Sequence, residues 1–281
     1  MLTLDEKKVR KGRPLGLPYQ GSKKKISKKI IEIIKQNFGT DKPIYDIFGG
    51  GGAITAECML NGLEVHYNDL DHTITDMFQR VLATDREFLK TLIVSRDEFL
   101  KILEKENKTV DDNLKLLVNS FGNKRRTYLY SKEKSDIKYN LAIEIIKNHD
   151  TFSGYRKTDI YLKQQPQRLQ QLEQLQQLQQ LQQLEATNLD FKAFSNIENA
   201  ILYLDPPYEG TTHEGYSIDG FDSQSLYDWA YNMSKKNIVL ISSYEISDER
   251  FECVYEFKKA RSTVQGGTSN NKTEKLFMVK K

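Results

Sequence analysis

The tetrapeptide at positions 205–208 is the part of the sequence best suited to chemistry; it consists of Asp205, Pro206, Pro207 and Tyr208. It follows the short apolar run 201–204, which is typical of a buried strand. Each proline lacks an N–H and holds φ at about −65°, so the strand must stop there and leave a rigid stub at its carboxyl end. Open parallel sheets bind their ligands at that end.

The reaction that this stub suits takes place at an amino group on a heteroaromatic ring. The Asp205 carboxylate and the Pro206 carbonyl can both accept hydrogen bonds from the amino group, which draws its lone pair out of the ring and toward an electrophilic carbon. Tyr208 can stack on the ring, a contact that contributes roughly 1–3 kcal/mol per base. The alternative interpretation is a tight turn with a capping aspartate.

A run of four glycines, 49–52, is the second feature of this kind. It follows the apolar run that starts at Pro43 and continues through Asp46 to Phe48, and a helical stretch comes after it. Glycines at a strand-to-helix turn let the backbone approach a ligand closely, and an acid at the end of the next strand, here Asp69, can hold ribose hydroxyls. The run lacks the GxGxxG and GxxxxGK[ST] patterns, which favours a nucleoside over a pyrophosphate. A flexible surface loop is the alternative.

The segment 18–23 precedes an amphipathic, isoleucine-rich run and contains two side chains that suit ligand binding. Tyr19 can cover a ligand ring, and Lys23 can reach a carboxylate. A helix start surrounded by solvated basic residues explains the same letters without any function.

These motifs need a parallel sheet to position them. Strand, glycine turn, helix and the alternating run 63–67 form one βαβ unit, and the runs 200–204 and 237–243 with a helix between them form a second set. The fold class is therefore α/β, with mostly parallel strands. The tail, 251–281, has two strand-like runs around Gly266-Gly267, which predicts a terminal hairpin.

Between the two sets, residues 81–187 are polar and have a helical pattern, so we expect an inserted helical domain. Its most basic and aromatic part is expected to contact nucleic acid through Lys124, Arg125, Arg126, Tyr128 and Tyr130. A solvated helix face explains any single basic run equally well.

A leucine- and glutamine-rich tract, 164–185, has leucine at every third position from Leu169 to Leu184. A period of three drifts against the helical turn of about 3.6 residues, so these leucines are expected to wind around the helix surface without forming a heptad seam. Pro166 is expected in the first turn. A crossover helix lengthened by repeat expansion is favoured, and a dimer arm is the alternative.

Composition limits the class of protein. The chain has 281 residues with 38% hydrophobic and 29% charged, enough for one catalytic domain with an insertion. No window approaches a membrane span, and the amino terminus lacks a secretory signal, so we expect a cytoplasmic protein. The two cysteines and four histidines lack the spacing of a disulfide framework or a metal site, and we expect no metal. A net charge of +3 is too balanced to indicate nucleic acid alone.

The order PYQGSK, DIFGGGG, NDLD, long insertion and DPPY resembles the Dam-like family of N6-adenine DNA methyltransferases, including its bacteriophage members. The resemblance covers about residues 17–82 and 190–278. It implies a class I methyltransferase sheet, Rossmann-like, with an inserted target-recognition domain. The implied division is 1–80 for the first catalytic part, 81–187 for the insertion and 188–281 for the second catalytic part.

The resemblance also implies the site. S-adenosyl-L-methionine is the expected cofactor and double-stranded DNA the expected partner. The cofactor-binding residues that it implies are Tyr19, Lys23, Asp46, Phe48, Gly50, Gly52, Asp69 and Asp205. The residues that would hold the flipped adenine are Asp205, Pro206, Pro207 and Tyr208. A monomer or weak dimer is expected.

Three alternatives remain open at this point. Cytosine N4 methylation uses the same chemistry on a similar amino group, although SPPY is the common motif there. A protein glutamine methyltransferase also presents a PPY loop after a strand, and a catalytically idle DNA-binding regulator is a different class again. Two departures from the family matter: Tyr19 and Ser22 stand where many relatives have tryptophan and glycine, and the insertion does not clearly repeat the recognition motif of the GATC-methylating members.

Overall fold

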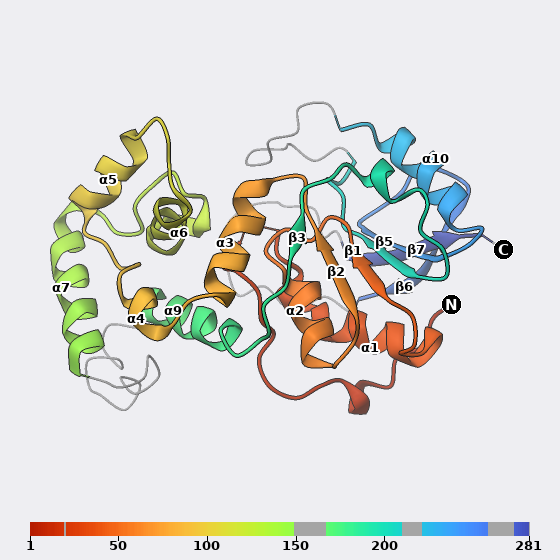
Figure 1. Cartoon of the computed structure of the whole chain (residues 1–281), viewed down its shortest axis with the longest axis horizontal. Helices are drawn as coiled ribbons and strands as arrows, with labels where there is room; N and C mark the ends of the chain where they lie inside the picture. Colours follow the sequence, from red (N-terminus) through yellow and green to blue (C-terminus); the bar gives the residue numbers. More distant parts are fainter. Residues whose placement is uncertain (20, 149–166, 210–220, 258–272, 281) are drawn as a thin grey trace.

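A computed structural model of the chain describes residues 1–19, 21–148, 167–209, 221–257 and 273–280. Its centre is a seven-stranded sheet of order β3-β2-β1-β4-β5-β7-β6, in which only β7 runs antiparallel to its neighbours (Figure 1). The strands are β1 (Ile44–Asp46), β2 (Val65–Asn68), β3 (Ala186–Thr187), β4 (Ile201–Leu204), β5 (Ile238–Ser243), β6 (Phe251–Glu256) and β7 (Lys275–Val279). The expected α/β class with mostly parallel strands is confirmed.

The described helices fall into two groups, one on the sheet and one beside it. Around the sheet lie η1 (Glu6–Lys8), η2 (Lys23–Lys25), α1 (Ser27–Phe38), α2 (Ala53–Leu60), α3 (His72–Leu82), η5 (Phe191–Phe194) and α10 (Ser223–Met233). Beside it lie α4 (Arg86–Lys90), α5 (Arg96–Glu104), α6 (Val110–Asn119), η3 (Phe121–Asn123), α7 (Lys132–Asn148) and α9 (Gln167–Leu178). Figure 1 shows this second group as a separate lobe joined to the sheet by α3 and α9.

Both faces of the sheet are covered, which explains why its central strands are apolar throughout. Successive side chains of a strand point to opposite faces. Ile201 and Tyr203 of β4 pack with α1 and α2 on one face, whereas Leu202 and Leu204 pack with α10 on the other. The predicted unit of strand, glycine turn, helix and strand is confirmed as β1, α2 and β2.

The register of the central strands brings their carboxyl ends to one edge. Asp46 of β1 lies opposite Tyr67 of β2 and Tyr203 of β4. Residues that follow these strands, including Asp69 and Asp205, must therefore emerge close together. This convergence is the structural basis of the site described below.

The carboxyl-terminal tail pairs as predicted, with one addition. β6 and β7 are antiparallel, as expected for a hairpin, but β7 also pairs with β5, with Ser243 opposite Lys275. The start of β7 is thereby placed next to the end of β5. The turn predicted at Gly266-Gly267 lies outside the described residues, as does Pro166.

The helical lobe occupies most of the predicted insertion, but the sheet resumes before the range ends. β3 pairs with β2, with Tyr67 opposite Ala186, so the last two residues of the range 81–187 belong to the sheet. The lobe also shares a hydrophobic core with α3 and with Leu15 and Leu17 of the amino-terminal segment.

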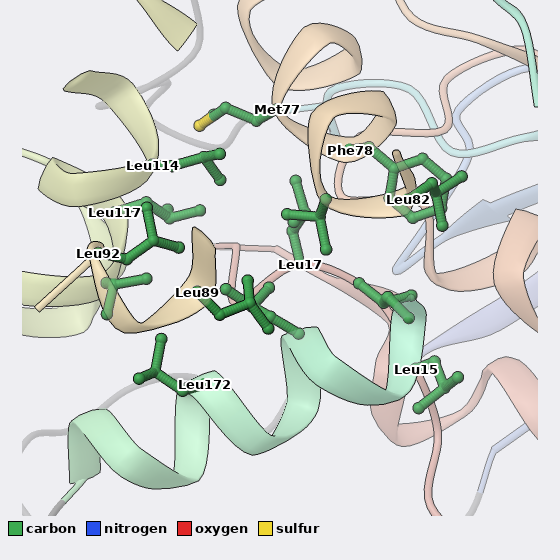
Figure 2. Packing of buried hydrophobic residues seen from close by; sticks show 14 of the residues in the cluster. Leu15, Leu17, Met77, Phe78, Leu82, Leu89, Leu92, Leu114, Leu117 and Leu172 are labelled. Atoms are coloured by element: carbon green, nitrogen blue, oxygen red, sulfur yellow. The ribbon is translucent and has the colours of Figure 1, made fainter. Parts of the chain in front are cut away.

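The leucines of α9 are expected to wind around the surface of the helix, but the structure buries them. Leu169, Leu172, Leu175 and Leu178 are all 0% exposed, and Figure 2 shows Leu172 in the core that also contains Leu17. A period of three spreads the leucines around the helix, and they are buried because α9 is covered from several sides by α3, α4, α6 and the amino-terminal segment. The dimer-arm interpretation loses its support, since these side chains pack within their own chain.

Polar contacts attach α9 to the amino-terminal segment as well. Arg13 pairs with Glu173 at 3.1 Å, and the Lys24 ammonium donates to the Gln174 side chain at 2.9 Å. Burial lowers the pKa of Lys24 to about 8. α9 is therefore held by both apolar and polar contacts. Among the helices described, none has the length and apolar character needed to cross a membrane.

Candidate active site

A cavity of about 170 Å³ lies at the carboxyl ends of β1, β2 and β4. Most of the residues predicted for the site line it. These are Tyr19, Lys23, Asp46, Phe48, Gly50, Asp69, Asp205 and Pro207. The structure thus places the Asp205 stub and the glycine turn on one cavity, as the proposed chemistry requires.

The glycine turn is built by hydrogen bonds and close packing that require glycine at specific positions. The Gly49 N–H donates to the Asn68 carbonyl at 2.8 Å, and the Tyr67 hydroxyl donates to the Gly50 carbonyl at 2.7 Å. A Cβ at Gly49 would lie 2.5 Å from the Tyr67 ring, and one at Gly52 would lie 2.4 Å from Phe78. Gly52, which has φ of +69°, begins α2 and is not among the cavity-lining residues. Gly52 therefore shapes the turn without lining the cavity.

Asp69 is the acid at the tip of the second strand. One carboxylate oxygen accepts from the Gly50 N–H at 2.8 Å and the other from the Asp71 N–H at 2.9 Å. Burial raises the pKa of Asp69, against these hydrogen bonds, which lower it. The side chain therefore ties the glycine turn to the end of β2 while it lines the cavity.

Asp46 is almost completely buried, with 1% of its surface exposed. Its Oδ2 accepts from the Thr55 N–H at 3.1 Å and from the Thr55 hydroxyl at 2.6 Å. Its Oδ1 has no hydrogen-bond partner within the described part of the chain. Burial raises the pKa of Asp46 to about 7, against the Thr55 hydrogen bond, which lowers it. An unsatisfied carboxylate oxygen at a cavity wall is an acceptor for a cationic or hydrogen-bonding ligand group.

Asp205 sits on the stub that follows β4. Its Oδ1 lies 2.8 Å from the Lys23 ammonium. Burial raises the pKa of Asp205 to about 6; the Lys23 charge lowers it and the Glu274 charge raises it. The sequence predicts that Lys23 can reach a carboxylate, and in this structure it reaches that of Asp205 while it also lines the cavity.

The other residues of the tetrapeptide have different positions. Pro206 is buried, and Pro207 lines the cavity. Tyr208 is not among the lining residues; its hydroxyl contacts Asp205 Oδ1 at 3.1 Å, and its ring meets the Tyr244 ring edge-on at 4.7 Å. The Tyr208 ring also has the Lys23 ammonium 4.9 Å from its centre.

Sequence reasoning missed a second hollow of about 210 Å³ that adjoins the first. Phe48 and Leu70 line both hollows. The second one also includes Asp190, Phe191 and Phe221. Asp190 and Phe191 follow the end of β3, and a strand of two residues has too weak a pattern to predict them.

The predicted nucleic-acid loop lies between α6 and α7 in the helical lobe. Lys124 and Arg126 are exposed, whereas Arg125 has φ of +60° and donates to the Asn113 side chain at 3.2 Å. Tyr128 is 5% exposed, and its hydroxyl donates to the Val94 carbonyl at 3.0 Å. The expectation that Tyr128 lies near bases does not agree with this burial.

Two further aromatic residues of the loop region differ in exposure. Tyr130 is half-buried, with the Arg168 guanidinium 4.9 Å from its ring centre. Phe121 is 68% exposed beside the basic residues, and no pattern in the sequence singles it out. The loop thus combines exposed charge with one exposed aromatic ring.

Within the described ranges no group of three or more His, Cys, Asp or Glu side chains is arranged to hold a metal. Cys58 is buried and Cys253 partly buried, both as free thiols. His149 and His213 lie outside the described residues.

Comparison with known proteins identifies the family. The family model of D12 class N6 adenine-specific DNA methyltransferases matches residues 19–260. Comparison with curated proteins gave no match. Among solved structures, the rRNA methyltransferase aviRa from Streptomyces viridochromogenes is similar with a TM-score of 0.43 and 11% identity, over 98% of this chain and 93% of that one. At that level of similarity the structure adds no argument about function.

The family match covers the glycine turn, the helical lobe and the DPPY stub, and the turn and the stub both line the cavity. It decides between adenine N6 and cytosine N4, which the motifs alone left open, and it confirms the resemblance and the class I methyltransferase fold. The chain belongs to the D12 class of N6 adenine-specific DNA methyltransferases and is an enzyme that methylates the exocyclic nitrogen of adenine in DNA.

Proposed function

We propose that the enzyme transfers a methyl group from S-adenosyl-L-methionine to N6 of an adenine that has been flipped out of double-stranded DNA. The observation that carries this proposal is the shared cavity: Asp205 lines the same space as Gly50 and Asp69. A base inside a duplex cannot present its amino group to such a cavity, and extrusion costs a few kcal/mol.

The residues of the cavity fit S-adenosyl-L-methionine, which when bound supplies the methyl group from its sulfonium. Asp46 has an unsatisfied buried carboxylate oxygen that suits an ammonium group. Asp69 suits ribose hydroxyls, and the aromatic rings of Tyr19 and Phe48 offer apolar surface. The glycines at 49–51 line the cavity, so the turn brings backbone rather than side chains to the ligand.

At the target base, Asp205 and Pro206 would act as fixed acceptors. The carboxylate at Asp205 and the carbonyl of Pro206 accept from the amino group, so its lone pair turns away from the ring. Lys23 holds the Asp205 carboxylate in place by its contact at 2.8 Å. Acceptors that are already oriented lower the barrier without reorganisation during the reaction.

DNA would be held by the loop of the helical lobe. The exposed charges of Lys124 and Arg126 suit phosphates, and Arg125 contributes mainly to the shape of the loop, because its guanidinium contacts Asn113. Phe121 replaces Tyr128 as the aromatic side chain that is exposed and able to reach a base. A monomer is favoured, since the leucines of α9 are buried within the chain.

The test is direct product identification. Purified protein is incubated with labelled S-adenosyl-L-methionine and unmethylated duplex DNA, and the modified nucleoside is identified after digestion. N6-methyl-2′-deoxyadenosine that depends on duplex DNA supports the proposal. Label in N4-methyl-2′-deoxycytidine, or in protein glutamine, contradicts it.

A further inference from the structure

A second carboxylate, that of Glu274, lies close to Asp205. It directly precedes β7 and comes close because β7 pairs with β5. The Ser242 hydroxyl of β5 donates to Glu274 Oε1 at 2.8 Å, and the Lys23 ammonium lies 3.8 Å from the same oxygen. Glu274 is not among the residues that line the cavity. It therefore stands beside the site without being placed to touch the methyl donor.

The Tyr208 hydroxyl lies between the two carboxylates. Its oxygen is 2.5 Å from Glu274 Oε1 and 3.1 Å from Asp205 Oδ1. A hydroxyl has one proton to donate, and the shorter contact is to Glu274. When the hydroxyl donates to Glu274, it does not also donate to Asp205 Oδ1, which already contacts Lys23, so the Asp205 carboxylate keeps more of its acceptor capacity for an amino group.

We propose that Glu274 is a positioning residue for methyl transfer: it accepts the hydrogen bond of the Tyr208 hydroxyl and thereby keeps the Asp205 carboxylate available as an acceptor for the target amino group. The inference rests on the proposed role of Asp205. It requires no contact between Glu274 and either substrate.

The charges around Asp205 make its pKa a test of this role. Among the described residues, the titratable and charged groups that face it are Lys23 beside β4, Tyr203 and Tyr208 on the same segment, Asp46 at the end of β1 and Glu274 before β7. Lys23 lowers the pKa of Asp205 and Glu274 raises it. Neutralising Glu274 must therefore move the titration of Asp205 to lower pH.

The main experiment compares Glu274→Gln with wild type and with Glu245→Gln. Glu245 is a suitable control because it is 73% exposed and pairs with Lys275, the neighbour of Glu274 in the chain. We expect Glu274→Gln to reduce kcat roughly tenfold or more, since small misplacements of reacting groups have effects of that order. KM for S-adenosyl-L-methionine should stay at the wild-type value.

The pH profile separates positioning from a purely structural effect. In wild type, kcat/KM should rise with pH as Asp205 ionises near 6, because this ratio reports groups of the free enzyme. In Glu274→Gln that rise should occur at lower pH, whereas Glu245→Gln should follow wild type. An unshifted profile with unchanged kcat overturns the inference.

A second pair of variants covers the case in which Glu274→Gln folds poorly. Glu274→Asp keeps the negative charge, but its shorter side chain moves the carboxylate away from the Tyr208 hydroxyl. We therefore expect kcat to fall while the rise of kcat/KM with pH stays at the wild-type position. Tyr208→Phe removes the hydroxyl whose hydrogen bond Glu274 accepts. In that background the Glu274→Asp change should have a smaller effect on kcat. Equal effects in both backgrounds contradict the proposal.

Failure of this inference can be told apart from failure of the proposed function. If wild type and Glu245→Gln both produce N6-methyl-2′-deoxyadenosine in DNA and Glu274→Gln behaves identically to them, only the role of Glu274 is wrong. If wild type itself fails to methylate adenine, the proposed function is wrong.

Discussion

In the sheet region the chemical groups follow the ends of strands and are buried, whereas in the helical lobe the charges assigned to DNA lie on an exposed loop. Asp46 and Asp205 are fixed by the register of β1 and β4 and by contacts to Thr55 and Lys23. Lys124 and Arg126 have no such constraint from a sheet. On the proposed function, variants in the sheet region should change the rate of the chemical step, and variants in the loop should change DNA binding.

The largest expected effect follows from Asp205→Asn. Loss of a fixed charged acceptor should reduce kcat by roughly 10²–10³-fold, as for other preoriented groups that stabilise a transition state. DNA affinity should change little, because the DNA loop lies in the other region. Asp41→Asn, at a side chain that is 77% exposed, is the matched control. A kcat equal to that of the control would remove Asp205 from the mechanism.

The rigidity of the sheet region is tested by two glycines with nearly the same φ. Gly52 has φ of +69° and Gly62 has φ of +68°, but a Cβ meets Phe78 at 2.4 Å only at Gly52 and nothing within 4 Å at Gly62. Alanine at either position costs about 1–2 kcal/mol for the left-handed conformation. Gly52→Ala should reduce the free energy of unfolding by a further ~1–3 kcal/mol from overpacking. Urea unfolding measures the difference, and equal losses would show that the turn is not tightly packed.

The double variant Lys124→Ala with Arg126→Ala tests whether the exposed loop of the helical lobe contacts DNA. DNA binding should weaken, and its salt dependence should become shallower by about one unit of slope for each phosphate that is no longer neutralised. At saturating DNA, kcat should equal that of wild type. Lys235→Ala, a lysine after α10 that contacts Asn232, is the control. An unchanged salt slope would move the DNA surface to another part of the chain.

The smallest expected effect concerns Asp46 and stability. The folded pKa of about 7 lies above the ordinary value of 3.8, so burial favours the protonated form. The stability that this form contributes is fully present below the ordinary pKa and is lost as pH rises through about 7. Asp46→Asn cannot ionise, so its Tm in the absence of ligands, relative to wild type, should increase between about pH 5 and about pH 8. A difference that does not vary with pH argues that Asp46 is ionised throughout.

The same contrast explains how much of the molecule could be predicted from its sequence. Strand, glycine turn and helix are local patterns, and parallel register follows from the βαβ connection, so Gly50, Asp69 and Asp205 are expected near one another and line one cavity. The basic loop is also visible in the sequence. The roles of its individual residues are not, since the pattern around Tyr128 is the same for a buried and an exposed ring.

What the sequence could not supply comes from long-range contacts. Glu274 reaches Tyr208 only because β7 enters the sheet between β5 and β6, a pairing that no local pattern specifies. Lys23 meets Asp205 across more than half of the chain length, a contact that no local pattern specifies either. The leucines of α9, predicted at the surface, are buried because several distant elements surround the helix.

The central claim is that Asp205 and Pro206 accept hydrogen bonds from N6 of the target adenine. The most direct measurement is a crystal structure of the enzyme with duplex DNA and a non-reactive S-adenosyl-L-methionine analogue. We expect an extruded adenine whose N6 lies about 3 Å from both the Asp205 carboxylate and the Pro206 carbonyl. An adenine that remains stacked, or an N6 that contacts neither oxygen, would contradict it.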